Sequence, residues 1–307
     1  MQINHMVIAI SNQISFRVAK ILAISVSLVY LLCGVNYVHA ASLPLDAKQI
    51  VIEEGTADVL AKIKSAARSQ NIKKKSMGEI MQWVSLQLVG SPYVPALLDK
   101  TTPEYLYIGL SKTDCMLFTE EVLVLSRLIK NNKLDMNNFT SGIYNVRYHD
   151  GFSYCKRNHY FKDWALNNQK QNLVIDQGLK LTNETLPYDA HVLSDRIKTS
   201  QNHAQDFSCI SEREAFINKE KIGFISMDKL PSNLKSIKPG DIIGIVRIPS
   251  GKADSVAHLG IAYIHDGEVG MIHASSGSAR KVIVEKSLTN YLAKFKDSQG
   301  IILLRVQ

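Results

Sequence analysis

Apolar residues recur at helical spacing in three segments of the first half of the chain. The spacing predicts helices over residues 56–68 and 76–88, and a third that begins near Thr113-Asp114 and runs to about Lys130. The predicted buried stripe of the third helix consists of Phe118, Val122, Leu125 and Ile129. Ser76, followed three residues later by Glu79, forms the capping box expected at the start of the second helix.

The last quarter of the chain changes to short apolar runs separated by turns. The predicted strands cover residues 242–248, 256–264, 269–274, 281–285 and 301–306. Asp266-Gly267 is the signal of a tight hairpin between the second and third of them. Helices followed by an antiparallel sheet indicate an α+β domain. Residues 137–236 are polar and aromatic without a clear period, so they are predicted as a segment inserted into that domain.

The N-terminus has the three parts of a secretory signal. Arg17 and Lys20 precede an uncharged apolar run over residues 21–35, and Val38-His39-Ala40 ends it as a cleavage site. The run is short for a membrane span, which needs roughly 20 residues. Residues 1–40 are therefore predicted as a cleaved signal peptide and 41–307 as the mature domain, periplasmic or secreted, with no stable membrane association. The alternative is a retained N-terminal anchor.

Composition narrows the class of protein. The chain has 307 residues, 46% of them hydrophobic, which is enough for a real core and excludes collagen-like and disordered classes. Its formal charge of +8 falls to +6 once Arg17 and Lys20 are removed. That charge is too small to indicate a nucleic acid partner, and no nucleic-acid motif is present. The Lys73-Lys74-Lys75 run is interpreted as a solvated linker rather than a polyanion site.

Three cysteines remain after the predicted signal, namely Cys115, Cys155 and Cys209. An odd number in an oxidising compartment leaves one thiol free if a pair forms. One hypothesis is a Cys155–Cys209 bridge with Cys115 kept for chemistry. The other is three buried thiols without a role, and the sequence does not decide between them.

A thiol and two imidazoles are candidates for catalysis. Cys115 falls in the first turn of the third predicted helix, where free N–H groups and the helix dipole are expected to lower its pKa. His258 and His273 lie on strands that the Asp266-Gly267 hairpin makes neighbours. The expected roles are nucleophile for Cys115, base for His258 and orienting group for His273. Each residue taken singly is more often structural.

The sequence predicts neither a metal site nor a cofactor. His258, His265 and His273 could supply ligands, but zinc needs three or four close donors, and neither an HxH nor an HxxxH pair occurs. The expected mechanism therefore uses side chains alone.

Six motifs in order resemble one family. They are Gly90-Ser-Pro-Tyr93, Asp114-Cys115-Met-Leu-Phe-Thr-Glu120, Tyr144-Asn-Val-Arg147 with Arg157-Asn-His159-Tyr-Phe-Lys-Asp-Trp164, Lys238-Pro-Gly-Asp241, Ala257-His258-Leu-Gly260 and His273-Ala-Ser-Ser276. Together they resemble the NlpC-type papain-like cell-wall hydrolases, and most closely their N-acetylmuramoyl-L-alanine amidase-like branch. Met116-Leu117 stands where much of the wider superfamily has Ser-Gly, which favours the amidase-like branch over the γ-D-glutamyl endopeptidases.

The resemblance implies a papain-like (NlpC-type) α+β fold and a cysteine amidohydrolase acting on peptidoglycan or muropeptides through a thioester. The scissile bond would be the N-acetylmuramoyl–L-alanine amide. It also implies that Tyr93 lines the cleft near the thiol. Asp114, Arg147, Arg157 and His159 are candidates for binding substrate, although a structural role is as well supported for the two arginines and His159.

Three other functions stay open at this point. They are a γ-D-glutamyl–diaminopimelate endopeptidase of the same fold, a murein-binding protein without turnover, and an acyltransferase using the same thiol and imidazole. The oligomeric state cannot be predicted from the sequence.

Overall fold

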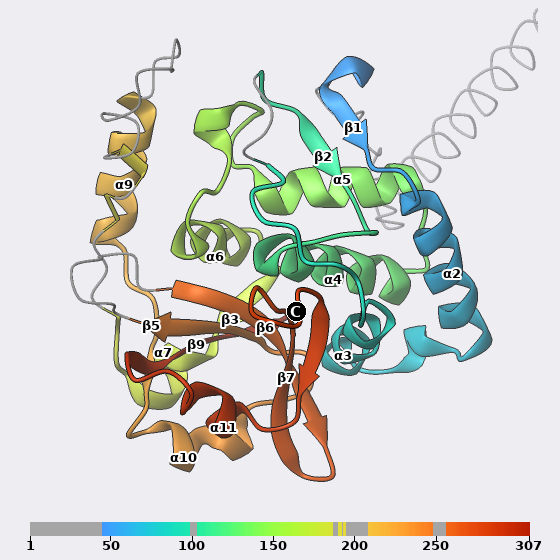
Figure 1. The fold of residues 1–307 in the computed structure, drawn as a ribbon. Coiled ribbons are helices and arrows are strands. Elements are labelled where there is room, and N and C mark those ends of the chain that lie inside the picture. Colours follow the sequence, from blue (N-terminus) through green and yellow to red (C-terminus); the bar gives the residue numbers. More distant parts are fainter. Residues whose placement is uncertain (1–44, 99–102, 187–189, 192, 195–207, 248–255) are drawn as a thin grey trace, which may run out of the picture. The chain divides into compact units, whose positions relative to one another are not determined.

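The predicted helices and strands are present, and they meet as helices packed on an antiparallel sheet (Figure 1). The computed structural model describes residues 45–98, 103–186, 190–191, 193–194, 208–247 and 256–307. The predicted signal peptide lies outside these residues. Residues Pro44–Gln307 form one compact unit.

The first part of this unit is helical except for a small two-stranded parallel sheet. Its elements are η1 (Ala47–Gln49), β1 (Ile50–Ile52), α2 (Thr56–Ser69), η2 (Ile72–Lys74), α3 (Met77–Gln87), β2 (Leu106–Ile108) and α4 (Cys115–Lys130). The predicted capping box is present at α3, where Ser76 N–H donates to Glu79 Oε2 over 2.9 Å. The whole predicted stripe of α4 is buried, and so are most of the helix's polar residues.

The middle of the chain, which sequence patterns did not assign, forms short helices and two strands. They are α5 (Met136–Arg147), η3 (Tyr154–Lys156), α6 (Phe161–Lys170), β3 (Val174–Asp176), α7 (Gln177–Thr182), α9 (Ser208–Lys219), β4 (Ile225–Ser226), α10 (Leu230–Asn233) and η4 (Leu234–Ser236). Both β3 and β4 pair with the last strand of the chain. This segment therefore completes the main sheet as well as covering it.

The main sheet is antiparallel and follows the order β3-β9-β5-β6-β7-β8, with β4 paired to β9 beside this path. The remaining elements are β5 (Ile242–Arg247), β6 (Val256–His265), β7 (Glu268–Ala274), β8 (Val282–Glu285), α11 (Leu288–Leu292) and β9 (Ser298–Val306). Asp266 and Gly267 both have positive φ, at 51° and 81°, as the predicted two-residue hairpin requires.

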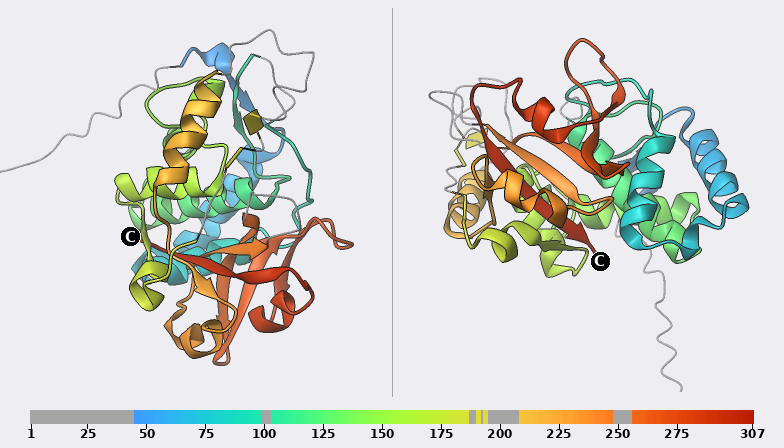
Figure 2. Two further views of the ribbon diagram at one scale, coloured as in Figure 1. Left: turned by 90° about the vertical axis from the view of Figure 1, so that its left-hand side faces the viewer. Right: turned by 90° about the horizontal axis from the view of Figure 1, so that it is seen from below.

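The two faces of the sheet are covered by different helices, as the views in Figures 1 and 2 show. On one face Ile243, Ala262 and Met271 pack with residues of α10 and α11. On the other face α3 and α4 pack against β6 and β7. Gly244 lies on this second face, where a side chain at its position would meet the Phe161 ring of α6 at 2.8 Å. Successive side chains along a strand point to opposite faces, and because helices cover both faces, both sets of side chains are buried.

A disulfide joins Cys155 to Cys209, with 5.8 Å between their Cα atoms, and leaves Cys115 as a free thiol. The structure confirms the first of the two hypotheses that the sequence left open, the Cys155–Cys209 bridge. It ties η3 to α9 across 54 residues of sequence, which restricts the unfolded chain more than a short loop would.

Gly78 lies in the first turn of α3, where no room is left for a side chain. A Cβ there would lie 2.1 Å from the carbonyl oxygen of Pro239. An exposed helix position gains up to about 1 kcal/mol from Gly→Ala, but here the clash should reverse the sign and cost about 1–3 kcal/mol. Urea denaturation of Gly78→Ala measures this, with Gly277→Ala as a control, since its nearest contact is 3.6 Å away. A Gly78→Ala protein more stable than wild type would contradict this contact.

Candidate active site

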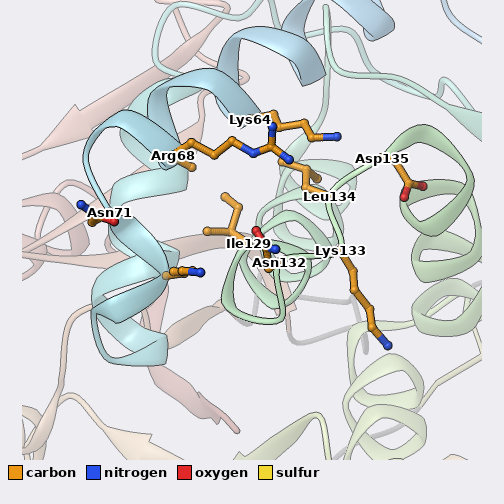
Figure 3. A pocket seen from close by; sticks show the side chains of 10 residues that line it. Lys64, Arg68, Asn71, Ile129, Asn132, Lys133, Leu134 and Asp135 are labelled. Atoms are coloured by element: carbon orange, nitrogen blue, oxygen red, sulfur yellow. The ribbon is translucent and has the colours of Figure 1, made fainter. Parts of the chain in front are cut away.

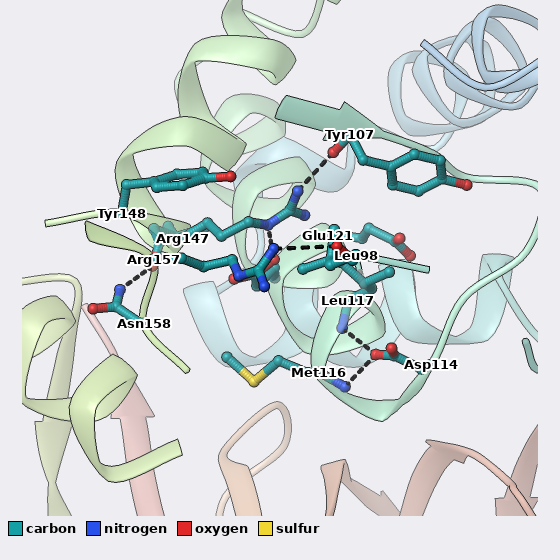
Figure 4. Close-up of polar contacts among 12 residues, drawn as sticks. Leu98, Tyr107, Asp114, Met116, Leu117, Glu121, Arg147, Tyr148, Arg157 and Asn158 are labelled. Carbon is teal, nitrogen blue, oxygen red and sulfur yellow. Dashed lines mark hydrogen bonds and ion pairs between the residues drawn. The ribbon is translucent and has the colours of Figure 1, made fainter. Parts of the chain in front are cut away.

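Cys115 is the first residue of α4, and the half-buried thiol lies at the start of that helix. Asp114 is the N-cap residue, and its Oδ1 accepts hydrogen bonds of 2.9 Å from the N–H groups of both Met116 and Leu117 (Figure 4). The helix starts here because an aspartate in extended conformation satisfies two of its free N–H groups.

His258 and His273 lie side by side on β6 and β7. His258 Nε2 and His273 Nδ1 are 2.7 Å apart, and the two rings meet edge to face. The register pairs Ile261 with Ile272, so Gly260 stands opposite His273 and His258 is its diagonal neighbour. His273 is fully buried, whereas His258 is half-buried.

The backbone between these histidines and α4 brings the thiol to the same place. The N–H of Leu259, the residue after His258, hydrogen-bonds to the Cys115 sulfur. Within the described residues no hydrogen bond joins the sulfur directly to the His258 ring. Such contacts are often long without substrate and tighten when it binds. The sequence therefore selected three residues that the fold does bring together.

The expected lowering of the thiol pKa is wrong for this structure. Burial and the carboxylate of Asp114 raise the pKa of Cys115 to about 12, although backbone N–H groups of Leu259, Cys115 and Met116 act in the opposite direction. Burial also lowers the pKa of His258 to about 4 and, together with the neighbouring imidazole, that of His273 to about 3. Burial of the sulfur, together with the negative charge of the Asp114 carboxylate beside it, outweighs the backbone N–H groups at the helix start. At neutral pH the resting groups are a thiol and two neutral imidazoles.

Tyr93 lies beside the thiol, held by backbone bonds on both sides. Its N–H donates to the carbonyl of Arg280 over 2.9 Å, and Val94 N–H donates to the carbonyl of Thr113 over 2.9 Å. Burial raises the pKa of the Tyr93 hydroxyl, and the nearby Cys115 raises it further. The segment Gly90–Val94 therefore connects the start of α4 to the sheet.

Glu121 of α4 supports the residues just before Cys115 through Thr113. Burial raises the pKa of this carboxyl well above its ordinary value, which favours its protonated form. The Glu121 carboxyl lies 3.3 Å from Thr113 Oγ1, and Thr113 Oγ1 donates to the carbonyl of Asp114 over 3.1 Å. A protonated carboxyl can donate to that hydroxyl, which leaves the hydroxyl hydrogen for Asp114.

Arg147, a candidate for binding substrate, is buried behind α4. Its Nε donates to Glu120 Oε2 over 2.8 Å and its Nη1 to the carbonyl of Tyr107 over 2.6 Å. Arg147 and Glu120 are 2% and 1% exposed, so they form an internal ion pair. The guanidinium of Arg147 therefore faces a carboxylate of the protein, and its role toward substrate stays a prediction.

Arg157 and His159 are also engaged inside the protein. Arg157 Nη1 donates to Glu104 at 3.1 Å and to the carbonyl of Leu98 at 3.3 Å (Figure 4). The His159 ring nitrogen Nε2 donates to the carbonyl of Tyr154 over 2.7 Å, and burial lowers the pKa of His159 to about 3. Arg157 is thus tied to the segment before β2 and His159 to the turn at Tyr154, and their roles toward substrate stay predictions.

A pocket of about 230 Å³ lies between α2 and the end of α4, and none of the candidate site residues lines it (Figure 3). Lys64 and Arg68 reach over it from α2, with Lys73 and Lys133 at its edge. Arg68 lies in the last turn of α2 and Lys133 follows the end of α4, positions where positive charge offsets the helix dipole. The pocket therefore needs no anionic ligand to explain its charge.

Two further residues lie against members of the site, one beside His273 and one beside Tyr93, and sequence patterns did not indicate either. The Tyr291 ring of α11 lies 5.0 Å from the His273 ring, and Arg280 lies over the Tyr93 ring at 5.3 Å. Neither stands in a motif of its own, so only the packing reveals them. In the described part of the chain, no cluster of three or more His, Cys, Asp or Glu side chains is arranged to hold a metal ion. None of the helices described is long and apolar enough to cross a membrane.

The fold and the site define an α+β protein in which a thiol at a helix start faces two histidines of an antiparallel sheet. The chain belongs to the AmiA-like family, described as N-acetylmuramoyl-L-alanine amidase-like, whose model matches residues 83–301. The amidase-like assignment made from the motifs is thereby confirmed. No curated protein matches the chain.

Solved structures with the same fold include two Bacteroides proteins. An N-acetylmuramoyl-L-alanine amidase from Bacteroides uniformis is 27% identical with a TM-score of 0.69, covering 75% of this chain and 99% of its own. A putative xylanase from Bacteroides fragilis is 26% identical with a TM-score of 0.65, covering 72% and 99%. A Legionella pneumophila protein, at 22% identity and a TM-score of 0.59 over 81% and 94%, shares the fold. Together with the family, the amidase neighbours support a cell-wall amidase-like function.

Replacement of Arg147 should cost stability rather than substrate affinity. Arg147→Ala removes the ion-pair partner of the buried Glu120 carboxyl, and breaking such a buried pair should cost about 3–5 kcal/mol. Chemical denaturation measures it. Arg68→Ala removes the same side chain from an exposed position and should change the free energy of unfolding by less than about 0.5 kcal/mol. A stable Arg147→Ala protein with a raised KM would instead make Arg147 a substrate ligand.

The rate of Cys115 alkylation should depend on pH as expected for a thiol of high pKa. Only the thiolate reacts with iodoacetamide, so the rate should keep rising from pH 6 to pH 10 without a plateau. The physical reason is the raised pKa of the buried Cys115 beside Asp114. Labelling at Cys115 is located by peptide mass spectrometry, with Cys115→Ser as the blank. A rate already constant between pH 5 and pH 8 would show a resting thiolate–imidazolium pair and contradict this description.

Proposed function

We propose that the protein is an exported, cysteine-dependent N-acetylmuramoyl-L-alanine amidase of the NlpC-type papain-like superfamily. The observation that carries this proposal is the 2.7 Å contact between His258 and His273 beside the Cys115 thiol. A nucleophile, a base within reach and a group that orients the base are the parts that acyl transfer needs. The family and the amidase neighbours support the substrate class.

In the proposed reaction the sulfur of Cys115 attacks the carbonyl carbon of the lactyl group that is joined to L-alanine. His258 takes the thiol proton as the S–C bond forms and returns it to the nitrogen of L-alanine as the C–N bond breaks. His273 accepts a hydrogen bond from His258 and so keeps the other ring nitrogen of His258 unprotonated. Water then attacks the thioester, with His258 again as base, and releases the muramoyl carboxylate and the thiol.

The charge that develops on the carbonyl oxygen must be held by N–H groups that are still free. Asp114 occupies those of Met116 and Leu117, which leaves the N–H of Cys115 itself as the donor from this turn. Tyr93 lines the same side of the site. Because the resting thiol is neutral, proton removal and attack belong to one step in this mechanism.

A muropeptide digest with wild type beside Cys115→Ala tests the proposal. Wild type should release stem peptides that begin at L-alanine, and Cys115→Ala should release none, as measured by mass spectrometry. The two proteins should unfold at the same temperature, which controls for folding. Disaccharide dipeptides as products would instead identify a D-glutamyl endopeptidase. Binding to murein without cleavage by either protein would identify a binding protein and overturn the hydrolase.

A further inference from the structure

We propose that Arg280 binds a free carboxylate of the substrate peptide at the edge of the Cys115 site. This inference rests on the proposed function, and it adds that the enzyme prefers stem peptides whose second residue, D-glutamate, keeps its α-carboxylate.

Arg280 is placed next to the nucleophile by the same backbone bonds that hold Tyr93. The Arg280 carbonyl accepts the N–H of Tyr93 over 2.9 Å, and its guanidinium carbon lies 5.3 Å from the centre of the Tyr93 ring. Tyr93 in turn lies close enough to Cys115 and Asp114 for their charges to raise its pKa, while Arg280 lowers it. One aromatic ring therefore separates an arginine from the predicted nucleophile.

The backbone at Arg280 is in a conformation that arginine rarely adopts. Its φ is +45°, in the left-handed region that favours glycine. The residue is exposed, so no core packing requires a long side chain at this position. Strained positions of this kind collect at functional sites, where the surrounding structure holds them for a purpose. Glycine would relieve the strain, but it would remove the guanidinium from the site.

The guanidinium also has no acidic partner among the described residues, unlike other cations near the site. Lys294 lies over the Tyr291 ring but is paired with Glu285 at 3.2 Å, and Arg247 is paired with Asp297 at 2.8 Å. The contact with the Tyr93 ring restricts where the Arg280 guanidinium lies, and its N–H groups can still donate to a ligand. A planar fork of donors matches a carboxylate with two parallel hydrogen bonds.

The proposed substrate presents such a group close to the bond that is cut. D-glutamate follows L-alanine in the stem peptide and continues the chain through its side-chain carboxyl, so its α-carboxyl is left free. When that carboxyl is amidated, the negative charge is lost while the shape is almost unchanged. The pair of acid and amide therefore isolates the interaction with Arg280.

The test compares N-acetylmuramoyl-L-alanyl-γ-D-glutamyl-L-alanine with its D-isoglutaminyl analogue as substrates, so that the γ-carboxyl is in an amide bond in both. Wild type should have a kcat/KM at least about tenfold higher for the acid, and Arg280→Gln should remove most of that preference. Arg280→Gly should do the same while unfolding at an equal or higher temperature, which separates recognition from folding. Lys281→Gln removes one charge from the adjacent exposed residue and should keep the preference.

Equal kcat/KM for acid and amide in wild type would overturn the role of Arg280 and leave the amidase intact. Loss of the preference in Lys281→Gln to the same extent would also overturn it, because general electrostatic attraction would then suffice. If wild type cleaves neither compound, calorimetric binding decides. Tighter binding of the acid that depends on Arg280 would support the carboxylate site although the proposed hydrolysis had failed, and equal binding would reject both.

Discussion

The position of Cys115 depends on a short backbone ladder between the start of α4 and the edge of the sheet. Gly90 N–H donates to the carbonyl of Val282, and Val282 N–H donates back to the carbonyl of Ser91, at 2.9 and 2.8 Å. Three residues after Ser91, the N–H of Val94 donates to the carbonyl of Thr113. Helix α4 and strands β7 and β8 are thus linked by hydrogen bonds that do not depend on side chains. A thiol and two histidines far apart in sequence keep a defined relation because of this connection.

Beneath the ladder, α4 is held by charged side chains in the interior. Glu120 is paired with Arg147, and burial raises the pKa of Glu121 well above its ordinary value. Isolated buried charges are costly, whereas paired and hydrogen-bonded ones fix a single arrangement. The helix that carries the nucleophile is therefore surrounded by groups that cannot shift independently, and this suits a reaction in which the thiol must meet a carbonyl carbon at a fixed distance. The buried arginine of the motif serves this arrangement directly.

The sequence was most informative where local patterns and long-range packing agree. The helix over 76–88, the helix that ends at Lys130 and the hairpin at Asp266-Gly267 have strong periodicity, caps or turn residues, and each appears within one or two residues of its predicted bounds. Residues 137–236 were not assigned because their short elements depend on partners elsewhere. β3 and β4 have three and two residues and exist because β9 pairs with them.

For the site, residue type and order in the sequence were enough to select Cys115, His258 and His273, because a hairpin makes its two strands neighbours and a helix start can be recognised by its cap. The protonation state was not accessible in the same way. The pKa of the Cys115 thiol depends on burial and on how the Asp114 carboxylate is used, and both are properties of the packed molecule. The surroundings of Arg147 and Arg280 could not be predicted from the sequence either. Tertiary contacts alone give Arg147 a buried carboxylate partner and place the exposed Arg280 beside Tyr93. The sequence by itself determined which chemical groups the protein carries and on which elements, whereas solvent exclusion and long-range contacts decided their charges and which of them can meet a substrate.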